Sequence, residues 1–104
     1  MTTIRVACGD SYSHVFNLLK ADNVTPADLS AATGVNLNVV ELDTRTVLWV
    51  LPCTIVDVAT AEVSVTIGAP VTTTKAMYSM EFDILSGTSV MSCPSMAEQG
   101  LWVY

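Results

Sequence analysis

The side chains best able to do chemistry are few in this sequence and lie far apart along it. There is one histidine, His14, and there are three cysteines, Cys8, Cys53 and Cys93. A hydrolytic site needs a nucleophile, a base and a group that orients the base, and a zinc site needs several thiol or imidazole ligands at suitable spacing. The sequence has no C-x-x-C pair and no H-E-x-x-H motif. We therefore expect the cysteines to be small buried apolar residues and His14 to be a packed or rim residue.

Glu81 and Asp83 are the other candidates for catalysis. They alternate within "AMYSMEFDIL", so on a strand they would share one face, about 7 Å apart. A carboxylate pair needs a cleft to act as acid and base, whereas alternating acids are usual on the wet face of a strand. No glycine-rich phosphate loop and no G-x-S-x-G elbow accompany them. We therefore predict that the protein is not an enzyme and binds no metal or cofactor.

Composition limits the fold and the partners. The chain has 104 residues, enough for one domain over residues 1–104, and 51% of them are hydrophobic while 13% are charged. Such a chain buries enough apolar surface to fold. The net charge is −6 and the four basic residues are scattered, which is unlike a nucleic-acid-binding protein. We expect no nucleic-acid partner.

Membrane and export signals are missing from the sequence. The longest uncharged runs, residues 46–56 and 63–74, are interrupted by Pro, Gly and Thr and are shorter than the roughly 18 apolar residues of a membrane-spanning helix. The first ten residues contain no apolar stretch of signal-peptide length. We expect a protein that is made in the cytoplasm and has no membrane partner.

Alternation of apolar and polar residues is the main structural signal. In "AMYSMEFDIL", for example, Tyr78, Met80 and Phe82 face one way, and the residues between them face the other. Seven or eight such segments, separated by turn residues and without a βαβ repeat, predict an all-β domain built as a two-sheet antiparallel sandwich. The predicted strands cover residues 3–8, 11–20, 35–43, 46–58, 61–68, 76–85, 90–94 and 101–104.

One segment changes character in the middle. "VTPADLSAATGVNLNVV" begins like a helix, with Thr25 as a possible N-cap and Pro26 at the first helical position. A helix that starts there would have to end before Gly34, which is too short to be stable alone. We expect an extended loop with at most one short helical turn near residues 26–30, pinned to the core by Leu29 and followed by a strand.

Two segments are unusually apolar. The central "TVLWVLPCTIVDV" is the most apolar stretch, and its proline must lie at an edge, a bulge or a bend. The C-terminal "GLWVY" is either an edge strand that closes the sandwich or a surface that packs against another protein or another copy. If these segments form interfaces, aromatic anchors should dominate them. The candidate interface residues are Met1, Ile4, Leu101, Trp102 and Tyr104 at the termini, and Trp49 and Pro52 as a second patch.

Several motifs together resemble a pattern of tailed-bacteriophage structural proteins. They are "GDSYSHVFNLL", "NVTPADLSAATGVNLNVVE", "AEVSVTIG" and "AMYSMEFDILSGTSV". The chain resembles the immunoglobulin-like N-terminal domain of phage baseplate upper proteins, over most of its length from Arg5 to Tyr104. It departs from the pattern at Asn23, Val24 and Ala31, where Asp, Gly and Gly are usual. The resemblance implies an immunoglobulin-like β-sandwich and a place in the virion.

The resemblance leaves the location in the particle open. Family members carry a receptor-binding or oligomerising segment after this domain, and the present sequence stops at Tyr104. We therefore expect a small head decoration (cement) protein that holds its own copies and the major capsid or another virion protein together by multivalent contacts. A baseplate or tail-fibre attachment protein is the alternative. A carbohydrate-binding sandwich, using Trp49, Tyr78 and Trp102 as stacking platforms, is an alternative of another class.

Overall fold

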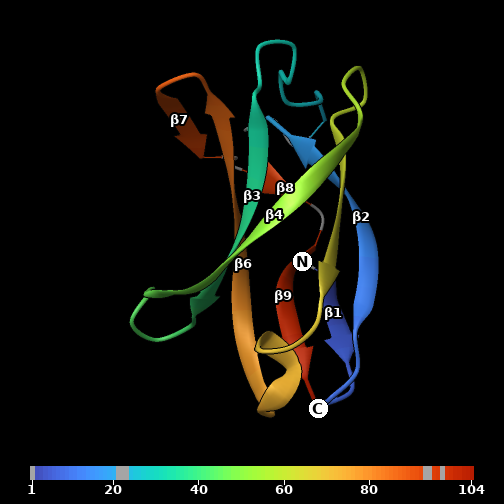
Figure 1. Ribbon diagram of the computed structural model, residues 1–104, viewed down its shortest axis with the longest axis vertical. Helices are drawn as coiled ribbons and strands as arrows, with labels where there is room; N and C mark the ends of the chain where they lie inside the picture. Colours follow the sequence, from blue (N-terminus) through green and yellow to red (C-terminus); the bar gives the residue numbers. More distant parts are fainter. Residues whose placement is uncertain (1, 21–23, 93–94, 97) are drawn as a thin grey trace.

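The computed structural model describes residues 2–20, 24–92, 95–96 and 98–104, and the part of the chain it describes is all-β (Figure 1). This confirms the predicted fold class. One short 3₁₀ turn, η1 (Val71–Thr73), is the only helical element in these residues. The strands are β1 (Thr2–Val6), β2 (Tyr12–Leu19), β3 (Gly34–Glu41), β4 (Val47–Asp57), β5 (Glu62–Ile67), β6 (Ala76–Ser86), β7 (Ser89–Ser92), β8 (Ser95–Met96) and β9 (Glu98–Val103).

The strands form one continuous curled sheet, nearly closed into a barrel, where the sequence predicted two separate sheets. The hydrogen-bonded order is β1-β9-β6-β3-β4-β5-β2-β8, and β7 pairs with β6 off this path. The connection between the two halves is β4. Its first part, Val47 to Cys53, pairs with β3, and its last part, Thr54 to Asp57, pairs with β5. β4 therefore crosses the molecule diagonally, as Figure 1 shows.

The inward faces of the strands supply the core. Phe16 and Phe82 lie edge to face with their ring centroids 5.0 Å apart and are fully buried. On β6 the predicted alternation is observed, with Tyr78, Met80 and Phe82 buried, and β3 adds Val35, Leu37 and Val39. Burying aliphatic side chains of this kind contributes about 1.5–3 kcal/mol each, so this core accounts for much of the driving force for folding.

The predicted helical turn near residues 26–30 does not form. Pro26 makes an isolated antiparallel bridge to Leu19, and the Ala27 N–H donates to the Leu18 carbonyl at 2.8 Å, so the chain is extended there. Asp28 then accepts from the Ser30 hydroxyl and N–H, which lowers the pKa of its carboxyl. Leu29 is 2% exposed and pins the loop to the core, as predicted. Backbone pairing with β2 therefore outcompetes a helix too short to be stable.

β4 is the least buried of the long strands although it is the most apolar. Trp49, Leu51 and Cys53 face inward and only partly pack against the core, while Leu48 and Val50 face solvent with exposed fractions of 40% and 54%. The reason is its pairing, because each half of β4 has a strand on only one side. We call the solvent-facing side chains Leu48, Val50, Pro52 and Val56 the outer row of β4.

Candidate functional site

The most distinctive surface lies on the outside of β1, β9 and β6. Arg5 is opposite Trp102 in the parallel β1–β9 pair, and Trp102 is opposite Met77 in the antiparallel β9–β6 pair. The three side chains therefore form one row across three strands. The Arg5 guanidinium carbon lies 5.2 Å from the centroid of the Trp102 ring, which is a cation–π contact.

Two more side chains extend this row at the end of β9. Tyr104 lies next to Trp102 with its ring centroid 5.7 Å away, and Lys75 precedes β6. Lys75, Met77, Trp102 and Tyr104 line an open hollow of about 460 Å³. The exposed fractions are 46% for Met77, 39% for Trp102 and 51% for Tyr104. We call Arg5, Lys75, Met77, Trp102 and Tyr104 the basic corner, since it holds two of the four basic residues of the chain.

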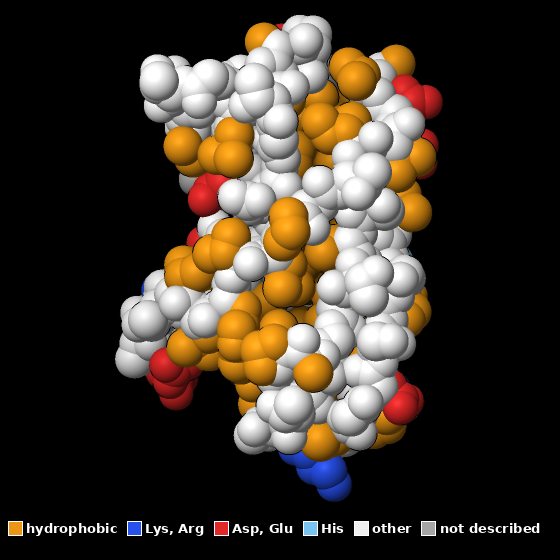
Figure 2. Space-filling view, in the orientation of Figure 1, with side chains coloured by type: hydrophobic (Ala, Val, Ile, Leu, Met, Phe, Trp, Pro, Cys, Tyr) orange, Lys and Arg blue, Asp and Glu red, His pale blue; other side chains and the backbone are white. Residues whose placement is uncertain are grey.

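A second part of the same outer face is acidic. Glu81 and Asp83 lie on the solvent side of β6, opposite Asn38 and Asn36 of β3. The Asn38 side-chain amide donates to an Asp83 oxygen at 2.9 Å, and Asn38 is only 7% exposed. Beyond β3, Val50 and Pro52 of β4 are opposite the same two asparagines. We call Val50, Pro52, Glu81 and Asp83 the acidic corner. Figure 2 shows hydrophobic side chains exposed on the face that β4 crosses.

The two acids lie on the open outer face of the sheet, and Asp83 is hydrogen-bonded to Asn38. Neither Glu81 nor Asp83 lines the hollow formed by Ser13, Leu51, Pro52, Thr54, Ser64, Val65 and Thr66. Among the described residues no group of His, Cys, Asp and Glu could hold a metal ion. The expectation that these acids form a wet strand face agrees with their position.

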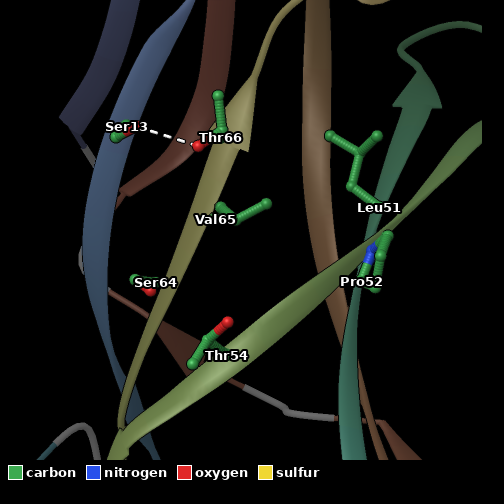
Figure 3. Close-up of a pocket in the computed structure, with 7 residues that line it drawn as sticks. All are labelled: Ser13, Leu51, Pro52, Thr54, Ser64, Val65 and Thr66. Atoms are coloured by element: carbon green, nitrogen blue, oxygen red, sulfur yellow. Dashed lines mark hydrogen bonds between the residues drawn. The ribbon is translucent and has the colours of Figure 1, made fainter.

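A hollow of about 330 Å³ lies where β4 diverges from β5 (Figure 3). Its floor is Val65 and Leu51, and its rim is made of small hydroxyl side chains. Ser13 and Thr66 on the rim are hydrogen-bonded to each other at 2.8 Å. Pro52 borders the opening, and because proline has no backbone N–H it cannot donate a hydrogen bond to an added strand. The hollow therefore has no acid–base pair, and its β4 side cannot pair with a further strand at Pro52.

His14 is held within a stack of aromatic rings. The Tyr12 hydroxyl lies 3.0 Å from His14 Nδ1, and the His14 ring is 4.6 Å from the Phe16 ring in an edge-to-face arrangement. All three rings lie on one face of β2, and burial increases from Tyr12 to Phe16. This agrees with the prediction of a packed rim histidine.

The cysteines differ from the sequence prediction. Cys8 is exposed because it lies in the turn after β1, so the expectation that it is buried is wrong. Cys53 is half-buried on the inner side of β4, where burial raises the pKa of its thiol to about 11. Cys93 is outside the described residues.

The structure separates the predicted interface residues into two groups. Ile4 and Leu101 are in the core, with exposed fractions of 6% and 0%, so their side chains are not available to a partner. Trp49 is on the inner face, edge to face with the buried Tyr78 at 5.6 Å. The predicted interface residues that are exposed are Pro52, Trp102 and Tyr104, and Met1 is outside the described residues.

Sequence reasoning missed the companions of Trp102. Arg5 could have been found, because alternation places it on the face opposite Ile4 and Val6. Met77 and Lys75 could not, because they meet Trp102 only through the pairing of β9 with β1 and β6. A parallel pair between the first and last strands leaves no local signal in the sequence.

Comparison with protein-family models and with curated proteins gives no match for this chain. In the described residues, no helix has the length and apolar character needed to cross a membrane.

Proposed function

We propose that this protein is a non-enzymatic structural protein of a tailed-phage virion, and that it decorates and stabilises the particle as a cement protein. One observation supports an assembly role above all others: the outer row of β4 exposes apolar side chains of the most apolar segment. Val50 and Val56 are 54% and 55% exposed, and Leu48 is 40% exposed. Contiguous exposed apolar surface of this kind marks sites of protein association.

In this proposal the particle is stabilised by the summed contact area of many copies of the chain. A single exposed sheet face buries a modest area, but many symmetric copies that each contact a shared shell hold it together through avidity. Such a role needs a rigid domain with an apolar outer face. The continuous sheet and the single core of this chain provide such a domain.

We also propose that the fold is a variant of the immunoglobulin-like sandwich. What supports this is the division of the strands at β4 into β1-β9-β6-β3 on one side and β5-β2-β8 on the other. In this view β4 is a strand that switches between two layers, which is a known way to join the layers of orthogonally packed sheets.

Quantitative mass spectrometry of purified particles tests the proposed function. The particles are phage particles purified from a culture in which the gene for this chain is present. The copy number of the chain is measured relative to the copy numbers of the shell and tail proteins. A copy number comparable to that of the shell protein supports decoration. A copy number comparable to those of tail proteins favours the baseplate or tail-fibre alternative, and absence from particles contradicts both.

The carbohydrate-binding alternative is weakened by the placement of its three aromatic residues. Trp49 and Tyr78 are on the inner face and Tyr78 is 6% exposed, whereas Trp102 is on the outer face of β9. They cannot form one stacking platform. A glycan array probed with the whole chain checks this, and the structural role predicts no binding.

A further inference from the structure

The two corners of the outer face carry opposite charges. The basic corner holds Arg5 and Lys75, and the acidic corner holds Glu81 and Asp83. Arg5, Lys75 and Glu81 are exposed. Met77 and Glu81 are on the same face of β6, four residues apart, which is about 13 Å along a strand. One side of one sheet therefore has a positive and aromatic region close to a negative and aliphatic one.

A surface of this kind is complementary to itself. A two-fold rotation about an axis that lies in the interface, midway between the corners, exchanges them, so each basic corner meets the acidic corner of the other copy. We propose that a second copy of this chain binds here, with the two outer faces packed against each other in an isologous dimer. This inference rests on the proposed assembly function and names the contact through which one copy recognises another.

Apolar groups supply the contact area in this arrangement, and charges set its register. Trp102 and Met77 of one copy face Val50 and Pro52 of the other, and aromatic side chains are typical anchors of interfaces. Arg5 and Lys75 face Glu81 and Asp83, which favours this orientation over its alternatives, because a shifted register would bring like charges together. The net charge of −6 opposes association elsewhere on the surface.

A charge-exchange experiment tests the proposal with the full chain. The variants are Arg5→Glu and Glu81→Lys, and their matched controls are Lys20→Glu and Glu62→Lys, which reverse charges on or next to β2 and β5 in the other half of the sheet. The dimer Kd of each is measured by sedimentation at low and high salt. Because a two-fold contact contains each substitution twice, we expect each test variant to weaken the homodimer by about tenfold or more.

Mixing the two variants is the decisive step. Arg5→Glu keeps its acidic corner and neutralises its basic one, while Glu81→Lys keeps its basic corner and neutralises its acidic one. The mixture pairs the two intact corners, so it should form a heterodimer that is tighter than either homodimer. The controls should dimerise like the wild type, and high salt should weaken the wild-type dimer. The proposal is overturned if the test variants dimerise like the wild type, if mixing restores nothing, or if the wild type stays monomeric at every concentration. A monomeric wild type that is still abundant in particles would leave the proposed function standing and remove only this contact.

Discussion

β4 and β9 are both apolar strands of one sheet, but they differ in how deeply their side chains are buried. β4 is the more apolar of the two, yet none of its residues is fully buried. β9 is shorter and contains Glu98, Gln99 and Gly100, yet Leu101 and Val103 are 0% exposed. β9 has β1 on one side and β6 on the other, whereas each part of β4 has a neighbour on one side only. For these two strands, burial follows the number of neighbouring strands and not the hydrophobicity of the segment.

The C-terminal strand is divided between the core and the surface. The apolar C-terminus was predicted to be either a closing strand or an interface, and in the structure alternate residues of β9 are buried and exposed. Leu101 and Val103 point inward, and Trp102 points outward. The apolar surplus that needs an explanation at the surface is therefore mainly on β4.

The largest expected effect is on β9. Leu101→Ala removes a fully buried side chain between β1 and β6 and leaves a cavity, so we expect the free energy of unfolding to fall by about 2–5 kcal/mol. Urea denaturation followed by Trp fluorescence measures it. A loss below about 0.5 kcal/mol would contradict the core position of β9.

The stability of the fold should depend on pH in the alkaline range, because of Cys53 on the inner side of β4. Burial raises the pKa of the Cys53 thiol from 9.0 to about 11 in the folded chain, so the unfolded state loses its proton first as the pH rises. The stability that this group contributes is complete below pH 9 and is lost as the pH rises toward 11. Cys53 is only partly buried, so the loss is at most about 2.7 kcal/mol.

Thermal unfolding at several pH values measures this loss. Cys53→Ala should lower stability at neutral pH and flatten its fall between pH 9 and 11, and the control Cys8→Ala, which removes an exposed thiol, should leave the stability at neutral pH unchanged. Equal slopes for the wild type and Cys53→Ala would show that the thiol titrates as if it were in water.

A smaller effect is expected on the outer face of β9. Arg5→Gln removes the cation that stacks on Trp102, and exposed cation–π contacts contribute about 0.5–1 kcal/mol. We expect that loss in the free energy of unfolding, with a change in Trp fluorescence of the folded state. Lys20→Gln is the control, and an equal loss for both would mean that Arg5 acts only through its net charge.

The smallest effect on folding is expected on the outer row of β4. Val50 is 54% exposed, so Val50→Thr, which keeps the β-branched shape, should change the free energy of unfolding by less than about 0.5 kcal/mol. Chemical denaturation at low protein concentration measures it. A loss as large as that of Leu101→Ala would place Val50 in a core and would end the contrast between the two strands.

The strands were predictable from the sequence, but their neighbours were not. Alternation put Tyr78, Met80 and Phe82 on one face, and all three are buried, because side-chain direction follows the two-residue period of a strand. It could not show that β4 pairs with β3 and then with β5, because hydrogen-bonding partners are distant in sequence. The same limitation placed Ile4 and Leu101 among the predicted interface residues. Their segment is at the end of the chain but in the interior of the sheet.

The outer row of β4 is the surface on which the proposed association depends. The most direct test is the mass in solution, by light scattering over a range of concentrations, of the wild type, Val50→Lys and the matched control Val15→Lys. Val15 is on β2 and is 48% exposed, close to the 54% of Val50, so both substitutions add a charge at a similar half-exposed site. If association uses this row, the wild type and Val15→Lys should reach a multiple of the chain mass, while Val50→Lys stays folded and monomeric. Equal masses for all three proteins would contradict it.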